Sequence, residues 1–165
     1  MESTESKALA ATLAEALVII PTYNEKENVR AITEAVLALS DGFDILIIDD
    51  NSPDGTAEIV EEMMKERPGR INLLRRAGKL GLGTAYIEGF KWALARDNYR
   101  YIFEMDADFS HNPADLTRLL KACREDGADV AIGSRYLTGV NVVNWPMGRV
   151  MMSYYASKYV RIVTG

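Results

Sequence analysis

Two carboxylates, Asp106 and Asp108, stand two residues apart in the run Met-Asp-Ala-Asp at residues 105–108. Side chains at this spacing on an extended chain project to the same side, which places both carboxylates in one small volume. At about 5 Å and an effective dielectric constant of about 20, two such charges repel by about 3 kcal/mol. A divalent cation reverses the sign of this energy, and Mg²⁺ or Mn²⁺ with substrate phosphates completing its shell fits the pair. The spacing alone leaves two interpretations open, a metal and phosphate site or two solvated loop aspartates.

A glycine-rich run, residues 78–83, reads Gly-Lys-Leu-Gly-Leu-Gly and precedes a helical pattern. Backbone N–H groups at such a helix entry, together with the ammonium of Lys79, could approach a phosphate. The run lacks the Walker spacing, and Tyr86 stands where a dinucleotide-binding G-x-G-x-x-G would end, so neither an NTPase nor an NAD site is supported. A plain helix-entry turn is the simpler interpretation.

Four more polar residues each allow a functional and a structural interpretation. Asp50 is typical of the acidic ribose-binding residue of nucleotide folds, and equally of a loop or capping carboxylate. Arg135 and Arg149 carry planar guanidinium groups suited to a diphosphate or a lipid phosphate, or to surface ion pairs. His111, the only histidine, stands beside a predicted helix start, so we interpret it as a local capping residue and not as a base.

Short β-rich runs alternate with longer helical patterns, which predicts an α/β fold with a mainly parallel sheet and helices on both faces. Five strands, each buried on both faces, are expected at residues 16–20, 44–49, 71–75, 101–105 and 129–132. In such a sheet, ligands bind beyond the carboxyl ends of the strands, where the polar residues described above stand.

Apolar stripes at helical spacing lie between these strands and predict core-facing helices. The stripes are Val29, Ile32, Val36 and Leu39, then Ile59 and Met63, then Leu116, Leu119, Leu120 and Cys123. A capping side chain directly before a proline, at Ser52-Pro53 and at Asn112-Pro113, predicts two helix starts.

Composition excludes several classes of protein. The chain has 165 residues, 48% of them hydrophobic, and a net charge of −5, which predicts about one soluble domain and no nucleic-acid partner. One cysteine, Cys123, excludes an internal disulfide framework, so we expect a cytosolic compartment and a core position for this residue. The apolar runs are far shorter than the ~20 residues of a membrane-spanning helix, so no span is expected.

The chain divides into three expected segments: an N-terminal extension at residues 1–15, an α/β domain at 16–140, and the start of a helical segment at 141–165. The last segment interleaves tyrosine and methionine with Arg149, Lys158 and Arg161. Three interpretations of it stay open: core packing, contact with a membrane surface, and self-association or contact with another chain. Because an apolar stretch ends there without a partner element, we expect the sequence to be a fragment.

Five motifs occur in order along the chain: PTYNE at residues 21–25, DDNSPDGT at 49–56, GLGTA at 81–85, MDADFSH at 105–111 and GSRY at 133–136. Together they closely resemble the inverting family 2 glycosyltransferases, most nearly the dolichyl- and polyprenyl-phosphate mannose synthase branch. The resemblance runs from about Leu17 to the last residue. Five ordered motifs are far more specific than any one of them.

This resemblance implies a GT-A nucleotide-sugar-binding catalytic domain at residues 16–140 that binds GDP-mannose. The residues it implies around the nucleotide are Pro21, Tyr23, Glu25, Ile48, Asp50 and Lys79. Asp106 and Asp108 would hold Mg²⁺ or Mn²⁺, and Ala107 would line the donor pocket through its backbone. Arg135, Arg149 and Ser153 would meet the phosphate of a dolichyl or polyprenyl phosphate acceptor. The implied enzyme is cytoplasmic and peripheral at the cytoplasmic face of a membrane.

The implied reaction transfers mannose with inversion to an acceptor phosphate that is already anionic, so no strong general base is required. The metal and Lys79 would stabilise the departing diphosphate, while Arg135 and Arg149 would hold the two anions close together. Ser110 stands where some relatives carry a glutamine metal ligand, which leaves the third protein ligand open. The family also continues past the end of this chain, so we expect weak donor retention and little turnover from this chain alone.

Three other functions remain open. A relative that transfers glucose or another sugar from a UDP donor to polyprenyl phosphate shares the diphosphate and metal motifs. A nucleotide-sugar-binding module without catalysis, or an interaction domain that uses residues 145–165, belongs to another class. The aspartate pair argues against the interaction domain.

Overall fold

The computed structural model describes residues 14–40, 42–134 and 146–164, with the side chain of residue 164 excluded. These residues belong to two compact units, Met1–Ala131 and Ile132–Gly165. Arg135 and Tyr136, the second half of the GSRY motif, lie outside the described residues.

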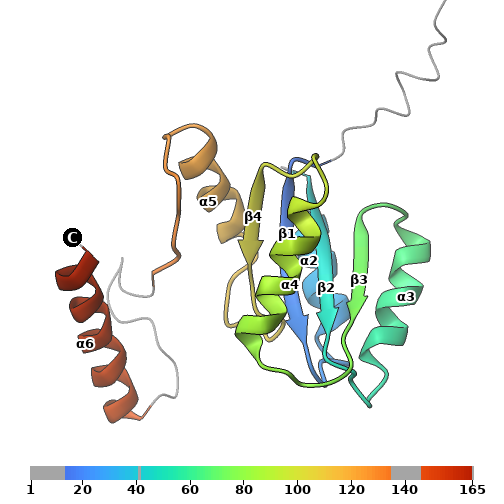
Figure 1. Ribbon diagram of the computed structural model, residues 1–165, viewed down its shortest axis with the longest axis horizontal. Helices are drawn as coiled ribbons and strands as arrows, with labels where there is room; N and C mark the ends of the chain where they lie inside the picture. The colour runs from blue at the N-terminus through green and yellow to red at the C-terminus, as the bar shows by residue number, and fades with distance from the viewer. Residues whose placement is uncertain (1–13, 41, 135–145, 165) are drawn as a thin grey trace, which may run out of the picture. The chain divides into compact units, whose positions relative to one another are not determined.

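The first unit is built on a parallel sheet whose described strands run in the order β3-β2-β1-β4 (Figure 1). The strands are β1 Ala16–Thr22, β2 Phe43–Asp49, β3 Ile71–Arg75 and β4 Tyr101–Glu104. All seven residues of β2 and six of the seven of β1 are buried, because these central strands are covered on both faces. The edge strands β3 and β4 are mostly half-buried, which corrects the expectation that every strand is buried on both faces.

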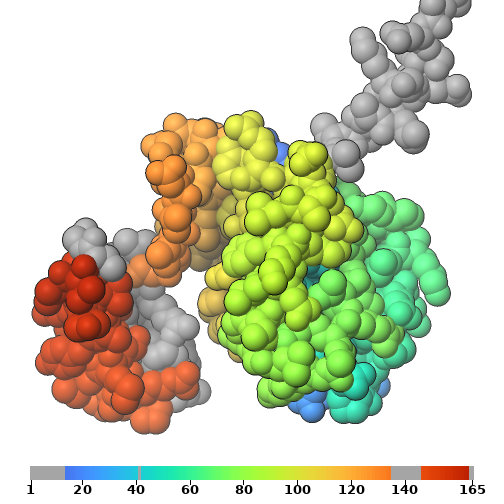
Figure 2. Space-filling model, in the orientation of Figure 1, coloured from blue at the N-terminus to red at the C-terminus, as the bar shows by residue number. Residues whose placement is uncertain are grey.

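Helices cover both faces of this sheet, as the sequence predicts. The helices of the first unit are α2 Val29–Leu37, α3 Thr56–Glu66, α4 Leu82–Leu94 and α5 Asp115–Arg124. One core cluster packs residues of α2, α3 and α5 against one face, and a second packs α4 against the other. In the view of Figure 1, α4 lies in front of the sheet and α2 behind it, and the space-filling view in Figure 2 shows α4 screening the strands.

The α4 helix approaches the sheet through a glycine. A Cβ atom added to Gly89 would lie 2.8 Å from Ile48 Cδ1 and 2.9 Å from Ile19 Cγ2 and Cδ1, closer than ordinary contact allows. Glycine at this position therefore lets the helix backbone pack directly on β1 and β2.

The fifth predicted strand is wrong. Residues 129–132 follow α5 without strand structure, and Val130 and Ile132 are 75% and 82% exposed. A short apolar run is compatible with a strand, but it needs a sheet edge to pair with, and none of the described strands pairs with this segment.

The two predicted helix starts lie two to three residues too early in the sequence. The α3 helix begins at Thr56 and α5 at Asp115, because turns at Pro53 and Pro113 precede them. The stripe residues Val29, Ile32, Val36, Met63, Leu116 and Leu120 are buried as predicted. Cys123 is half-buried, so it lies at the margin of the core.

The second unit contains one described helix, α6 Met147–Thr164. Most of its described side chains are exposed, including Met152, Tyr159 and Ile162, while Val150 and Ser153 are half-buried. Within the described part of the chain, no helix combines the length and apolar character required to span a membrane.

Candidate donor and metal site

The strand register brings the candidate residues to one edge of the sheet. Thr22 pairs with Asp49 and Asp49 with Arg75, so β1, β2 and β3 end in one row. Backbone bonds extend this row, since Asp50 N–H donates to Thr22 O at 3.0 Å and Arg76 N–H to Asp49 O at 2.8 Å. Met105 N–H donates to Ile19 O at 3.1 Å, which leads the chain from β4 to Asp106 at the same edge.

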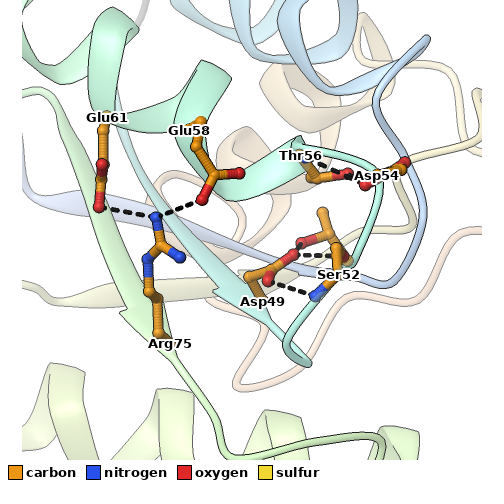
Figure 3. Close-up of polar contacts among 8 residues, drawn as sticks. Asp49, Ser52, Asp54, Thr56, Glu58, Glu61 and Arg75 are labelled. Carbon is orange, nitrogen blue, oxygen red and sulfur yellow. Dashed lines mark hydrogen bonds and ion pairs between the residues drawn. The ribbon is translucent and has the colours of Figure 1, made fainter.

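Asp49 joins the first two loops at this edge and is 1% exposed. Its Oδ1 accepts a hydrogen bond from Thr22 Oγ1 at 3.0 Å. Ser52 donates two more, from its Oγ to Oδ1 at 2.6 Å and from its N–H to Oδ2 at 2.9 Å (Figure 3). Ser52 Oγ also accepts a bond from Asn24 N–H at 3.0 Å. Asp49 therefore fixes the turns after β1 and β2, and Ser52 serves this turn instead of capping α3.

Asp54 makes a second connection between the same loops. Its Oδ1 accepts bonds from Thr56 N–H at 3.0 Å and Thr56 Oγ1 at 2.6 Å, and its Oδ2 accepts one from Lys26 N–H at 3.0 Å. Burial raises the pKa of Asp54, but these hydrogen bonds outweigh it and leave the pKa below its ordinary value. Glu25 N–H donates to Thr56 Oγ1 at 3.0 Å, so the segment that carries Tyr23 and Glu25 is held against the start of α3.

Asp50 lies at the centre of the edge and is 6% exposed. Its Oδ1 is 2.9 Å from Arg76 Nη1, and Arg76 is also 6% exposed. Burial raises the pKa of Asp50, Arg76 and the backbone N–H of Leu80 oppose the shift, and Asp49 and Glu88 add to it. The net result is a carboxyl whose pKa lies above its ordinary value.

Lys79 lies in the turn between β3 and α4, beside the loop after β1. Its Nζ is 4.6 Å from the centroid of the Tyr23 ring, a cation–π distance. Gly81 adopts φ +101° at the N-terminal boundary of α4, a backbone conformation that favours glycine. The predicted helix entry is therefore confirmed, and it presents an ammonium at the edge where Asp50 lies.

The aspartate pair follows β4. Asp106 Oδ1 accepts a bond from Tyr86 Oη at 3.4 Å, and its backbone N–H donates to His111 Nδ1 at 3.2 Å. His111 therefore holds the turn after β4, which replaces the predicted capping of α5. Ala107 is 4% exposed, so its side chain is buried and only its backbone could face a ligand.

Asp108 is exposed and is held from within its own turn. Its Oδ1 accepts a bond from Ser110 N–H at 2.9 Å. Hydrogen bonds from the Ser110 hydroxyl and backbone lower the pKa of Asp108 and outweigh its partial burial. The carboxylate thus stays ionised at neutral pH, as a metal ligand must.

These two carboxylates fit a hard divalent cation by their chemistry. Among the described residues, no three His, Cys, Asp or Glu side chains gather into a metal-binding group. Mg²⁺ and Mn²⁺ accept one or two protein carboxylates when substrate phosphates and water complete the shell. The arrangement is therefore suited to a metal that arrives with a phosphorylated ligand.

The other predicted site residues differ in position. Pro21 and Glu25 are half-buried, and Glu25 Oε2 accepts a bond from Asn28 Nδ2 at 2.9 Å. Ile48 is fully buried in the core beneath α4, so contact with a ligand would have to come from its backbone. Arg149 and Ser153 lie on α6 in the second unit.

Several site residues were missed by the sequence analysis, above all Arg76, Thr22, Asp54, Thr56 and Tyr86. Arg76 directly follows β3, at a position where residues approach a ligand, but its residue type does not separate it from Arg75. The contacts of Asp54 and Tyr86 depend on tertiary packing that no local pattern announces.

Comparison with known proteins gives relatives that are named as mannose synthases or mannosyltransferases. The chain is 48% identical over 149 residues to a polyprenol monophosphomannose synthase of Mycolicibacterium smegmatis, which covers 90% of this chain and 56% of that protein. It is 46% identical over 149 residues to an undecaprenyl-phosphate mannosyltransferase of Micrococcus luteus. This match covers 90% of this chain and 60% of that protein. The chain thus spans less than two thirds of the length of these curated relatives.

One solved structure with partial similarity to this chain is the mannosyltransferase of Pyrobaculum calidifontis in complex with GDP-Man and Mn²⁺. The match has a TM-score of 0.45 and 21% sequence identity, and covers 50% of this chain and 25% of that one.

The family model for glycosyl transferase family 2 matches residues 17–163. With that match over most of its length and a parallel α/β sheet, the chain belongs to glycosyl transferase family 2.

Proposed function

We propose that this chain forms the donor-binding part of an enzyme that moves mannose from GDP-mannose to the phosphate of a polyprenyl or dolichyl phosphate, with inversion and with Mg²⁺ or Mn²⁺. The observation that carries the proposal is that Asp50, Lys79 and Asp106 follow strands whose carboxyl ends share one sheet edge, in a chain whose relatives are named for mannosyl transfer to polyprenols. Carboxylates, an ammonium and helix-entry amides at one edge are the groups that a nucleotide sugar and its metal require.

The nucleotide would lie against the loops after β1, β2 and β3. Asp50 would accept hydrogen bonds from the nucleoside, and Lys79 would supply positive charge for the diphosphate. Pro21, Tyr23, Glu25 and the backbone of Ile48 would complete this subsite. Because Asp49 and Asp54 fix the first two loops through hydrogen bonds, the subsite is largely preorganised before the donor binds.

Asp106 and Asp108 would hold the metal, and the backbone of Ala107 would line the sugar end of the donor. The metal would supply positive charge at the diphosphate leaving group. Ser110, in the position where some relatives carry a glutamine, keeps Asp108 in place through its backbone N–H, so we assign it an orienting role.

Arg135, Arg149 and Ser153 would bind the acceptor phosphate. A phosphate oxygen is already anionic at neutral pH, so attack on the anomeric carbon requires alignment and charge neutralisation more than proton removal. The engagement of His111 Nδ1 by the Asp106 backbone agrees with a reaction that uses no histidine base.

The acceptor is a lipid, so we propose peripheral association with the cytoplasmic face of a membrane. The α6 helix supports this, because its exposed Met152, Tyr159 and Ile162 are interleaved with Lys158 and Arg161. Apolar side chains next to basic ones are suited to an interface with anionic lipid.

The experiment that tests the proposal is calorimetric titration of the chain with GDP-mannose, with UDP-glucose and NAD as comparators, each with and without Mn²⁺. We expect metal-dependent binding of GDP-mannose that Asp108→Asn reduces at least about tenfold, because one of two carboxylate ligands is lost. Asp126→Asn, a change at an exposed residue after α5, is the matched control and should bind as the unmodified chain does.

Binding of GDP-mannose justifies adding polyprenyl phosphate and measuring formation of the mannosyl lipid. Preference for UDP-glucose would move the assignment to UDP-sugar donors. Binding without transfer, also in a longer chain, would favour a nucleotide-sugar-binding module. Binding of no nucleotide by the folded longer chain would overturn the proposal.

A further inference from the structure

Arg76 is an unusually buried cation at the carboxyl edge of the sheet. Its side chain is 2% exposed, and its backbone is fixed by the bond from its N–H to Asp49 O. A guanidinium in such a position requires several polar partners, because burial of an unpaired charge is costly.

The partners of Arg76 come from the loop after β2 and from helix α4. Nη1 lies 2.9 Å from Asp50 Oδ1 after β2, Nη2 donates to Thr84 Oγ1 at 2.5 Å in α4, and Nε lies 3.3 Å from Glu88 Oε1. The contacts of Arg76 with Asp50 and Glu88 are at ion-pair distance but lack the geometry of a hydrogen bond. These two contacts therefore act through charge. Arg76 thereby connects the end of β2 to the beginning of α4.

The contact with Thr84 extends to the turn that carries Lys79. Thr84 Oγ1 donates to Gly81 O at 2.7 Å, and Arg76 Nη1 approaches the same oxygen at 3.5 Å. Gly81 O is in turn the acceptor for Ala85 N–H at 3.2 Å in the first turn of α4. Arg76 and Thr84 therefore hold the last residue of the turn in place.

We propose that Arg76 is a positioning residue for the donor: it holds the Asp50 carboxylate and the Lys79 turn in one arrangement, so that nucleoside and diphosphate are bound together. This inference rests on the proposed function, since the donor is the ligand that Asp50 and Lys79 would share. Arg76 itself is enclosed, so it acts through these two residues and not by touching the nucleotide.

The neighbouring Arg75 provides a matched control. It is the same residue type, it also makes two ion pairs, to Glu58 at 3.1 Å and to Glu61 at 2.8 Å, and it points to α3 (Figure 3). Its side chain is 44% exposed, against 2% for Arg76. A general effect of removing an arginine from this strand end would appear at both positions.

The charges around Asp50 add a readout that a purely structural role would not change. Its carboxylate faces Arg76 and the backbone N–H of Leu80, which lower its pKa, and Asp49 and Glu88, which raise it, while burial gives the largest upward shift. Loss of Arg76 removes the strongest opposing charge, so the pKa of Asp50 should rise further. Arg76→Lys keeps a positive charge but cannot reach all three partners at once.

The experiment compares the unmodified chain with Arg76→Met, Arg76→Lys, Thr84→Val and Arg75→Met. Three quantities are measured: the pKa of Asp50 by carbon-detected NMR without donor, amide hydrogen exchange at residues 80–85 without donor, and calorimetric affinity for GDP-mannose with Mn²⁺. The first two need no donor, so they judge the positioning role even if the proposed donor fails to bind. Thr84→Val removes the contact between Arg76 and the turn but keeps the buried charge. It therefore tests the inference even if the Arg76→Met chain does not fold.

We expect Arg76→Met to raise the pKa of Asp50, to speed exchange at residues 80–85 and to weaken GDP-mannose binding about tenfold or more. Arg76→Lys should restore the pKa more fully than the affinity, and Arg75→Met should match the unmodified chain. Thr84→Val should speed exchange with a smaller rise in the pKa of Asp50, because the backbone N–H of Leu80 also lowers that pKa. Equal losses in Arg75→Met and Arg76→Met, or an Arg76→Met chain with unchanged Asp50 pKa and turn exchange, would overturn the inference. Failure of the unmodified chain to bind, with the donor-free measurements as expected, would overturn the proposed donor and leave the positioning role standing.

Discussion

Lys79 Nζ lies 4.6 Å from the centroid of the Tyr23 ring, although Tyr23 follows β1 and Lys79 follows β3, with β2 between these strands in the sheet. The ring supports the ammonium without neutralising it, and no carboxylate of the described residues lies within ion-pair distance of Lys79. A cation placed in this way remains available to an anionic ligand at the carboxyl edge of the sheet.

Replacement of Lys79 by methionine should weaken GDP-mannose binding by about 10- to 100-fold, the worth of one charge-assisted hydrogen bond to phosphate. Tyr23→Leu should cost less, about two- to fivefold, because it removes only the ring beneath the ammonium. Calorimetric titration with Mn²⁺ measures both. Lys91→Met, an exposed change on α4, is the control, and a Lys79→Met chain that binds as tightly as this control would contradict the prediction.

Asp50 should show a conflict between stability and binding. Its pKa in the folded chain lies above the ordinary value, chiefly through burial, so the folded state binds its proton more tightly than the unfolded state does. The stability due to this shift is present below the ordinary pKa of 3.8 and is lost as pH rises through the folded pKa. At pH 7 the charged carboxylate therefore lowers the free energy of unfolding.

Asp50→Asn also leaves the buried Arg76 without its ion-pair partner, which costs stability. We accordingly expect the stability of Asp50→Asn relative to the unmodified chain to rise as pH rises through the folded pKa of Asp50, and its affinity for GDP-mannose to fall at least about tenfold. Urea unfolding at several pH values gives the first quantity and calorimetry the second. A variant that loses stability at pH 7 and keeps its donor affinity would show that Asp50 serves the fold and not the ligand.

Asp54 should behave in the opposite sense, because hydrogen bonds from Thr56 and Lys26 hold its pKa below the ordinary value of 3.8. A depressed carboxyl pKa contributes stability that is present above the ordinary value and lost as pH falls through the folded pKa. Asp54→Ala should lower the free energy of unfolding at pH 7 by about 1 kcal/mol, as loss of a cap-like carboxylate does. The difference from the unmodified chain should shrink below about pH 4, and a difference that is constant with pH would contradict the assigned hydrogen bonds.

The sheet could be predicted where the sequence contains a continuous apolar run that the fold then buries. The runs at β1 and β2 satisfy this condition, and both strands lie at the centre of the sheet. Residues 129–132 resemble them in composition, but Val130 and Ile132 are exposed, because pairing with a strand edge is a tertiary event that composition does not encode.

The residues of the candidate site likewise include some that the sequence predicts and some that depend on tertiary packing. Asp50, Lys79 and Asp106 could be located in advance, because parallel strands deliver the residues that follow them to one edge. Arg76 could not be distinguished from the exposed Arg75 beside it by residue type, since only the packing of α4 decides which arginine is buried. Ser52 was expected to cap α3, but its hydroxyl is already shared between Asp49 and Asn24.

The last prediction concerns the contact that fixes α4 to the sheet. Gly89→Ala should lower the free energy of unfolding by about 1–3 kcal/mol, because its new Cβ would lie 2.8 Å from Ile48 Cδ1 and 2.9 Å from two atoms of Ile19 in a core that is already filled. Gly83→Ala is the matched control in the same helix, since nothing lies within 4 Å of its added Cβ, and alanine there should be neutral or stabilising by about 0.5–1 kcal/mol. Urea unfolding of both variants separates the crowding of the core from the change in helix propensity. Equal stabilities for the two variants would mean that α4 can move away from β1 and β2 at little cost, and that the helix entry beside Lys79 is less firmly placed than the structure shows.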